Sequence, residues 1–420
     1  MIGFLDHTWS RGGRARLREL LLTPLGHADF IMKRQRVLQR LGSRLTGFDS
    51  TDLGHLLESV DRYASSSLLE LPQTSLGCMY VRLRYPGMVE ELVGGLEALI
   101  RLLDKVQLLA GLLENSSEED ELLPIATLLA SCLQRRSIRA LRRARTGSRR
   151  QLRLACLDRT VRRTDRDVLI GLIDALYRLD ALQSLARASQ RSCFTYPEVV
   201  DSRYPLVTAR RAFHPLISSP TPFDIDLDSS GRVVFLTGPN MAGKTTYLKT
   251  CGIIVVLAHI GMAVPAMSAR VSIFDRLFAV LSIHDNIDRG ESYFLAEVRR
   301  VGELVDRLSR GERMLALVDE MFKGTNVMDA HDATELVVSR LARCEKSVFM
   351  VSSHLVELAD RLSPIPAIRF LHFDAAIGDG RLLFSYELKP GVSRQRLGMA
   401  LLEREEVARS LEGVERAQSV

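Results

Sequence analysis

The sequence has 420 residues, 46% of them apolar and 26% charged, so it can bury a sizeable core and is long enough for two or three domains. Its six cysteines include no C-x-x-C pair, which argues against a disulfide framework and a thiolate metal site and favours a reducing, intracellular setting. No secretory leader opens the chain, and its longest apolar run, Cys251 to Met267, contains His259 and Pro265, so we expect a buried helix there rather than a membrane span.

The first half of the chain has the periodicity of helices. Up to about Gln190, apolar residues recur at spacings of three and four, as on the buried face of a helix, and strand-like runs are scarce. Pro24 and Gly26 separate the first helix from the second. We therefore predict an all-helical domain over residues 1–195.

One short segment of this domain carries all of the chain's excess of basic over acidic residues. The net charge is +6, and residues 135–166 contain thirteen arginines, no lysine and only two acidic residues. Thr146-Gly147-Ser148 interrupts the segment, which predicts a basic helical hairpin near 135–166 with its bend near Gly147.

The spacing of the arginines predicts a surface that contacts DNA. Arg135, Arg139 and Arg142 are expected to share one helical face, and Arg149 and Arg153 another. Clustered positive charge suits contact with the phosphates of duplex DNA, whereas most charge runs are only solvated helical faces, so both interpretations stay open. The candidate residues are Arg135, Arg139, Arg142, Arg143, Arg149, Arg150 and Arg153.

The second half of the chain has a different pattern. After Tyr196-Pro197, short β-branched and aromatic runs alternate with helical patterns, so we expect the domain boundary near 190–205. Strands are predicted at 232–237, 314–318 and 347–352, with a helix from Lys244. This alternation is typical of a parallel sheet with helices packed on it. We predict an α/β domain over residues 196–400 and a helical tail over 401–420.

A glycine-rich motif follows the first of these strands. The sequence TGPNMAGKTT contains G-x-x-x-x-G-K-T between a strand and a helix, a context that an ordinary glycine turn seldom has. In such a loop, backbone amides and the positive helix end hold phosphates, Lys244 neutralises the β and γ phosphates, and the Thr245 hydroxyl ligates magnesium. The predicted nucleotide-binding residues are Gly238, Pro239, Asn240, Met241, Ala242, Gly243, Lys244, Thr245 and Thr246.

Polar residues end the other two predicted strands. MLALVDE ends in Asp319 and Glu320, so Asp319 can join Thr245 in the magnesium shell and Glu320 can polarise the attacking water. Many strands simply end in solvated acids, so this pair is strong evidence for a magnesium site only in combination with the phosphate loop. SVFMVSS leads to His354, which can contact the γ-phosphate, although a lone histidine is as often without a special role. The sequence thus predicts a Mg²⁺-dependent ATPase.

With these residues in place, the chain resembles the MutS family of DNA mismatch-repair ATPases. TGPNMAGKTT resembles the family's TGPNMGGKST, and ALVDEMFKGTNVMDA resembles its run from the acidic pair to an aspartate, here Asp329. VSSHLVELA resembles its T-H-x-x-E-L segment, which implies that His354 contacts the γ-phosphate. Phe223 stands where the family stacks an aromatic residue on adenine, and a core phenylalanine is the equal alternative.

The resemblance extends to a dimer contact and to the helical half. DNIDRGESYFLAEV is similar to the family's signature region, in which a serine, here Ser292, reaches the nucleotide of the other subunit. Asp285 matches an acid before it, whereas Asn286 stands where a second acid is usual. LDHTWSRGGRARLRELLLTPL and LDALQSLA resemble the first and last segments of the family's lever domain. Because the first match begins at residue 5, we expect the mismatch-reading and connector domains to be missing and the DNA clamp to be shortened.

The resemblance implies a fold of class α + α/β, with an all-helical core or lever domain before a P-loop NTPase domain of the ABC/MutS type. It also implies an ATP- and Mg²⁺-dependent DNA-binding ATPase of mismatch repair, damage sensing or recombination control. Such a protein would be a homodimer through its ATPase domain, with DNA and repair proteins as partners, no membrane, and a cytoplasmic or nucleoid-associated location. The alternative is a nucleotide-switched regulatory or scaffold protein that binds no DNA. A generic ABC-type ATPase is disfavoured because the sequence has no L-S-G-G-Q run.

Overall fold

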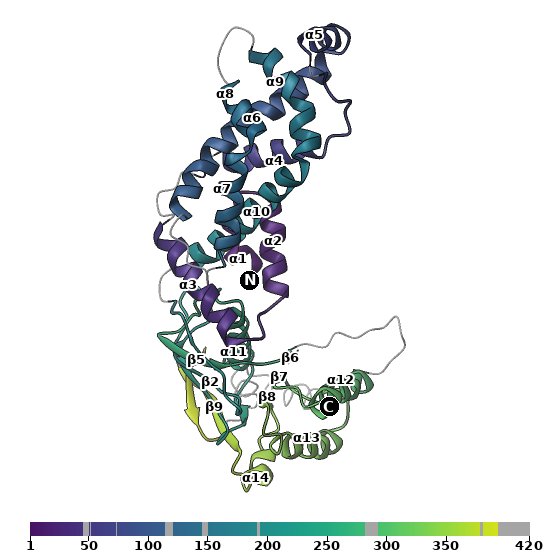
Figure 1. Ribbon diagram of the computed structural model, residues 1–420. Coiled ribbons are helices and arrows are strands. Elements are labelled where there is room, and N and C mark those ends of the chain that lie inside the picture. Colours follow the sequence, from purple (N-terminus) through teal and green to yellow (C-terminus); the bar gives the residue numbers. More distant parts are fainter. Residues whose placement is uncertain are drawn as a thin grey trace. The chain divides into compact units, whose positions relative to one another are not determined.

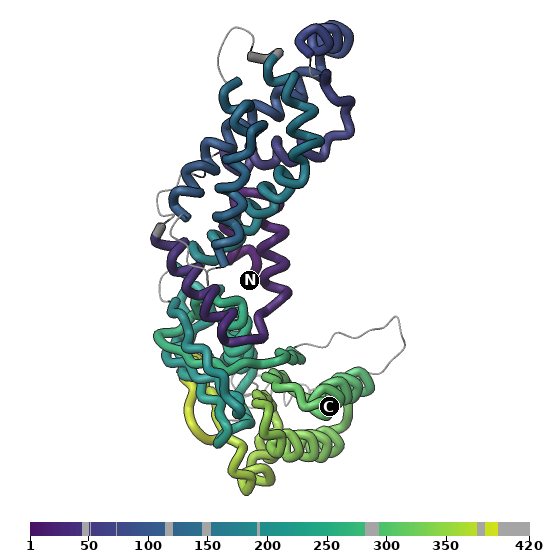
Figure 2. Tube along the Cα trace, viewed as in Figure 1, coloured from purple at the N-terminus to yellow at the C-terminus, as the bar shows by residue number. Residues whose placement is uncertain are grey.

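The computed structural model describes residues 1–44, 50, 52–72, 74–113, 121–144, 150–190, 194–281, 293–378 and 381–393 (Figure 1). Contacts divide the chain into two compact units. One comprises Met1–Pro24, Asp29–Ser192 and Ile260–Met262, and the other Leu25–Ala28, Cys193–His259 and Ala263–Val420. The Cα trace in Figure 2 shows the change from helices in purple and blue to a part with many strands in green and yellow.

The first unit is built from helices, as the apolar period predicts. They are α1 (Ile2–Leu5), α2 (Arg11–Leu22), α3 (Ala28–Arg44), α4 (Leu53–Ala64), α5 (Ser75–Arg84), α6 (Pro86–Leu113), α7 (Leu123–Gln134), α8 (Arg136–Arg143), α9 (Arg150–Arg159), the π-helical turn η1 (Thr160–Thr164) and α10 (Arg166–Ser189). Pro24 lies between α2 and α3, where the break was predicted. None of the helices in the part of the chain that the structure describes is long and apolar enough to cross a membrane.

Asp180 on α10 fixes the start of α2. Its carboxylate accepts hydrogen bonds from the Ser10 hydroxyl at 2.6 Å and from the backbone N–H groups of Trp9 and Ser10, both at 3.0 Å. Ser10 in turn caps α2 by accepting from the N–H of Gly13. A Cβ atom on Gly13 would lie 1.9 Å from the Asp180 carboxylate, so this close approach requires glycine. The two segments that resemble the family's lever helices therefore pack together.

The second unit contains two sheets. A four-stranded sheet has the order β1-β5-β2-β3, with β1 (Glu198–Val200), β2 (Val207–Ala212), β3 (Phe223–Leu227) and β5 (Ser268–Ser272). A six-stranded sheet has the order β10-β9-β4-β8-β7-β6, with β4 (Val233–Thr237), β6 (Arg276–Val280), β7 (Met314–Asp319), β8 (Val348–Ser352), β9 (Ile368–Gly378) and β10 (Arg381–Pro390). The helices of this unit are α11 (Lys244–His259), α12 (Tyr293–Ser309), α13 (Val327–Leu341) and α14 (Leu358–Leu362).

The order of strands in the six-stranded sheet brings the predicted phosphate loop and the predicted acidic pair to one edge. The three strands predicted from the sequence are β4, β8 and β7, which are neighbours in this sheet and run parallel. Their carboxyl ends therefore meet at one edge, where ligands bind in open α/β sheets. Apolar residues from these strands pack against α12, α13 and α14 and form one buried core. The fold is therefore of class α + α/β. The six-stranded sheet is mixed and not fully parallel, because β9 and β10 pair antiparallel.

One expectation of the sequence analysis needs correction, and one feature of the fold was missed. The apolar run from Cys251 to Met267 is helical only as far as His259, because α11 ends there and Val264 pairs with Thr195 in an isolated bridge. Buried His259 accepts a hydrogen bond at 3.0 Å from the N–H of Phe274, which explains a polar side chain in this run. The four-stranded sheet was not predicted, since its strands are short and lack clear alternation.

Candidate functional site

The loop between β4 and α11 has a backbone that its two glycines permit. Gly238 and Gly243 have φ angles of +135° and +113°, which residues with side chains rarely adopt. A Cβ atom on Gly238 would also lie 2.7 Å from the carbonyl oxygen of Phe373 on β9. Met241 at the tip of the loop has a φ of +65° and an exposed fraction of 83%. The loop thus leads directly into the N-terminus of α11, whose free N–H groups and positive dipole end attract anions.

Lys244 is the first residue of α11 and is folded into the loop. Only 5% of it is exposed. Its Nζ donates to the carbonyl oxygens of Gly238 at 2.7 Å and Pro239 at 3.0 Å. Burial lowers the pKa of Lys244, and the nearby charge of Glu320 partly offsets this. A bound phosphate would give this buried ammonium the anionic partner that two neutral carbonyls only replace in part.

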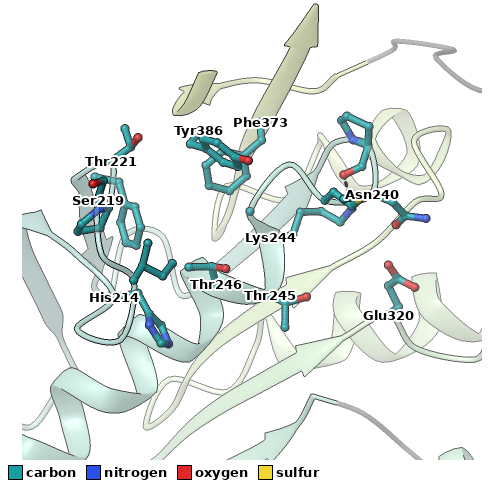
Figure 3. Close-up of a pocket in the computed structure, with 16 residues that line it drawn as sticks. His214, Ser219, Thr221, Asn240, Lys244, Thr245, Thr246, Glu320, Phe373 and Tyr386 are labelled. Carbon is teal, nitrogen blue, oxygen red and sulfur yellow. Dashed lines mark hydrogen bonds between the residues drawn. The ribbon is translucent and has the colours of Figure 1, made fainter. Parts of the chain in front are cut away.

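A cavity of about 510 Å³ opens beside the loop (Figure 3). Its lining is cationic and polar around Lys244 and Thr245, and aromatic around Phe223, Phe373 and Tyr386. The residues that line it are His214, Ile217, Ser219, Pro220, Thr221, Phe223, Pro239, Asn240, Met241, Gly243, Lys244, Thr245, Thr246, Glu320, Phe373 and Tyr386. Such a cavity suits a ligand with a planar apolar group at one end and phosphates at the other.

The aromatic end of the cavity comes from three different strands. Phe223 on β3 packs against Tyr247 of α11, with ring centroids 4.9 Å apart, and so keeps a fixed position in the wall. Phe373 on β9 lies 6.2 Å from the same Tyr247 ring. Tyr386 on β10 is 45% exposed with a φ of +54°. The sequence analysis named Phe223 but missed Phe373, Tyr386 and His214, because nothing in their spacing marks them.

Two candidate oxygen ligands for a cation lie together at the end of β7 and in the first turn of α11. The Thr245 hydroxyl donates to Asp319 Oδ2 at 2.6 Å. The other carboxylate oxygen of Asp319 accepts a hydrogen bond from the hydroxyl of Ser352, which is its neighbour on β8. Hydroxyl and carboxylate oxygens are ligands that magnesium prefers. The structure therefore brings together both residues that the sequence predicts as metal ligands.

Glu320 is held by two basic side chains. Its carboxylate pairs with Lys323 and lies 2.5 Å from His354 Nε2. Burial alone would raise the pKa of Glu320, but hydrogen bonds from His354 and Lys323 outweigh burial and lower this pKa to about 2. Glu320 is therefore ionised at neutral pH, as a group that orients water must be, and His354 lies beside it.

Other predicted residues lie elsewhere. Asp329 is not among the residues that line the cavity: its N–H donates to Asn326 Oδ1 at 2.9 Å and its carboxylate accepts from Asn326, so the pair caps α13. Ala242, within the loop, is fully buried and does not line the cavity. Ser292 and Asp285 lie outside the described residues.

The basic segment of the helical unit differs from its prediction. Arg135 has an extended backbone with ψ 138° and occupies the N-cap position of α8, which begins at Arg136, so it lies at the junction of α7 and α8 and not within one helix with Arg139 and Arg142. Arg142 donates to Gln107 at 2.6 Å and lies 3.6 Å from Asp104. By contrast, Arg139 and Arg143 are exposed and have no ion pair among the described residues. They line a groove of about 330 Å³ with Ile100, Asp104 and Arg142.

The end of the basic segment is structural. Arg162 is only 6% exposed and forms a two-pronged ion pair with the fully buried Asp158, at 2.7 Å and 2.6 Å. Arg159 and Arg163 both pair with Glu70. Arg153 on α9 is exposed, whereas Arg149, the bend near Gly147 and the side chain of Arg150 lie outside what the structure describes. Figure 1 shows α8 and α9 at the end of the helical unit away from α1.

These features define a class: an α/β unit with a glycine loop at a helix N-terminus, preceded by a helical unit. Residues 234–420 match the family model of MutS domain V. The DNA mismatch repair protein MutS of Granulibacter bethesdensis is 34% identical over 234 residues, which cover 54% of this chain and 25% of the relative. Residues 234–420 are therefore similar to MutS domain V, and the predicted resemblance is confirmed for this part of the chain. It spans about a quarter of the length of the curated relative it matches.

Proposed function

We propose that this chain is a Mg²⁺-dependent ATPase. The observation that carries the proposal is that Lys244 and Thr245, in the first turn of α11, lie close to Asp319 and Glu320 at the end of β7, beside a cavity with an aromatic wall. Phosphoryl transfer needs mainly positioning and charge stabilisation. This arrangement supplies an anion-binding loop, the ammonium group of Lys244 and the carboxylate of Glu320. The match to MutS domain V supports the same conclusion.

The nucleotide would lie along the cavity with its phosphates at the loop. Lys244 would turn from the carbonyls of Gly238 and Pro239 to the phosphate oxygens. The aromatic rings of Phe223 and Tyr386 are available in the wall to stack on the base.

Thr245 and Asp319 are the residues that would hold a magnesium ion. Their oxygens already converge at 2.6 Å, and a small separation of the two would admit a cation that keeps several of its waters. When held by Thr245 and Asp319, Mg²⁺ would neutralise part of the phosphate charge. Glu320 would orient the attacking water, with His354 near the γ-phosphate.

The substitution Glu320→Gln tests this chemistry. Because the shape of the side chain is kept and only its charge is lost, we expect ATP affinity within about threefold of the parent and a hydrolysis rate lower by roughly a hundredfold or more. Glu345→Gln, which changes an exposed glutamate outside the cavity, is the matched control. Hydrolysis at the parent rate by Glu320→Gln would exclude Glu320 as the residue that activates water.

We further propose that two chains join through this domain and that Ser292 of one acts on the nucleotide of the other. Exposed apolar residues support a protein contact here: Met241, Val327 and Met328 are 83%, 67% and 65% exposed. ATP should then strengthen dimerisation of the Glu320→Gln chain in sedimentation experiments. A monomer at micromolar concentration with and without ATP contradicts this. Mixing Ser292→Ala with Lys244→Ala chains should restore at most one site per heterodimer.

The process in which the ATPase acts is proposed to be DNA mismatch repair, damage sensing or recombination control, in the cytoplasm or nucleoid. The observation that favours DNA is the exposure of Arg139, Arg143 and Arg153 without ion pairs among the described residues. Two measurements with branched, mismatched and plain duplex DNA test the proposal: binding at low salt and the rate of ATP hydrolysis. If the parent binds none of these at low salt, the scaffold function is favoured instead.

A further inference from the structure

Glu297 on α12 is a buried acid that no part of the proposed chemistry uses. It is only 4% exposed. Its Oε1 accepts the backbone N–H of Lys323 at 3.1 Å, and its Oε2 accepts that of Gly324 at 3.2 Å. Both amides belong to the segment from Glu320 to Asn326, which connects β7 to α13. One carboxylate thus holds two consecutive amides of the segment that carries Glu320.

This segment requires such support because its backbone is strained. Glu320 and Phe322 have φ angles of +60° and +59°, in the left-handed region that residues with a Cβ atom rarely adopt. Strained conformations persist only where their surroundings determine them. Hydrogen bonds to an ionised carboxylate are stronger than neutral ones, so Glu297 is suited to this task. The ring of Phe294, also on α12, lies 5.9 Å from that of Phe322 and gives a second contact to the segment.

We infer that Glu297 is a positioning residue that holds Glu320 in its reactive orientation, an inference that rests on the proposed ATPase function. Glu297 does not line the cavity, so it acts only through the segment. The link is short: the residue whose N–H Glu297 holds, Lys323, is also the residue whose ammonium pairs with Glu320. Releasing the Lys323 backbone therefore changes both the direction and the partner of the Glu320 carboxylate.

The first test compares two glutamates of one helix. In Glu297→Gln, one carboxylate oxygen becomes an NH₂ group that faces a backbone N–H, so one hydrogen bond is lost and two donors oppose each other. We expect kcat to fall roughly ten- to hundredfold while KM and ATP affinity stay within about threefold, because a small misplacement at the reacting centre costs rate rather than binding. Glu303→Gln is the matched control, since Glu303 is exposed on α12 and pairs with Arg300 at the surface.

Two readouts separate positioning from a general loss of structure: a fall in kcat without a matching loss of ATP affinity, and rescue by a conservative variant. Glu297→Asp keeps the charge and should restore part of the rate. An unchanged kcat in Glu297→Gln, or a loss of ATP affinity as large as the loss of kcat, would overturn the inference.

Hydrogen exchange distinguishes this inference from the proposed function. In the nucleotide-free parent, the amides of Lys323 and Gly324 should exchange slowly, and Glu297→Gln should raise their exchange rates at least about tenfold while Glu303→Gln leaves them unchanged. If the parent hydrolyses ATP but these rates do not change, the inference about Glu297 is wrong and the ATPase proposal stands. If the parent hydrolyses no ATP, the proposed function fails, and the catalytic role of Glu297 falls with it.

Discussion

The glycine loop and the basic segment both stand out in the sequence, yet they differ in how far the sequence determines their structure. In the loop, Lys244 and Thr245 take up a single arrangement, set by the strand before them and the helix after them. In the basic segment, arginines of one chemical type enter three environments: Arg162 is buried, Arg142 is paired at the surface, and Arg139 is exposed. A motif with fixed spacing determines backbone geometry, whereas a biased composition leaves the environment of each side chain open.

The difference also separates stability from function. Arg162 is charged and buried, and its contacts with Asp158 and with the carbonyls of Leu68 and Leu69 satisfy most of its donors. Tyr63 donates to the same aspartate at 2.9 Å. This network joins α4, α9 and the turn η1 and leaves no charge for an external partner. The functional arginines of the segment must therefore be sought among the exposed ones.

The largest effect is expected at the buried pair. Arg162→Ala leaves the Asp158 carboxylate buried without its cation, so the helical unit should lose about 3–5 kcal/mol of unfolding free energy. Arg139→Ala, which removes an exposed arginine, should change it by less than about 0.5 kcal/mol. Urea unfolding measures both. Equal stability of the two variants would show that burial does not divide the segment as described.

The next effect concerns the loop. Lys244→Ala removes a buried ammonium at the phosphate position, and because hydrogen bonds to charged groups are the strong ones, ATP affinity should fall roughly a hundredfold or more. Lys249→Ala is the control on the same helix, since Lys249 is exposed and does not line the cavity. Titration with a fluorescent ATP analogue measures both. Comparable affinities of the two variants would contradict the assignment of the loop to phosphate.

A smaller effect is expected for the exposed arginines. Changing Arg139, Arg143 and Arg153 together to Ala should flatten the dependence of log affinity for duplex DNA on log salt by about 3, from a parent slope of about −4 to −5. Basal ATP hydrolysis should be unaffected, because these residues do not line the cavity. The control removes the same charge from three other exposed arginines of the helical unit: Arg11, Arg18 and Arg62. An equal change of this slope in both variants would mean that the effect depends on net charge and not on the position of the arginines.

Much of the nucleotide site could be predicted because its determinants are local in the sequence. The glycines set the loop, and Asp319 ends β7, which pairs with β8, the neighbour of β4. Tyr386 and Phe373 could not be predicted, since their closeness to the loop depends on the order of β10, β9 and β4 in the sheet. Glu297 was missed for a similar reason: its two partners lie 26 and 27 residues away, across a packing contact that no pattern marks.

The helical half shows the same limit. Its apolar period predicts helices correctly, and Pro24 marks a true break. The break at Arg135 was missed because the sequence around it, Gln134-Arg135-Arg136, contains no glycine or proline. Which arginines would be buried depends on partners such as Asp158 and Tyr63, which belong to different helices.

The smallest effect is expected at the partly exposed pair of Glu320 and His354, which contrasts with the buried pair of Arg162 and Asp158. Hydrogen bonds from His354 and Lys323 lower the pKa of Glu320 from 4.5 to about 2 against the opposing effect of burial. A lowered carboxyl pKa stabilises the folded state above the unfolded pKa and loses that contribution as pH falls toward the folded one. His354→Ala should therefore cost up to about 1 kcal/mol at pH 6, and this difference should shrink between pH 4.5 and 3.

Urea unfolding of His354→Ala and its parent across this pH range measures the effect, and a background that lacks the titrating group provides the control. In a Glu320→Gln chain, the cost of His354→Ala should not depend on pH in the same window, because no carboxyl proton is then linked to unfolding at this position. A cost that stays constant with pH in the parent as well would mean that His354 does not stabilise the ionised form of Glu320. His354→Ala could instead lower the free energy of unfolding by as much as Arg162→Ala does. Partial exposure would then not weaken this pair, and the two regions would differ by residue type rather than by burial.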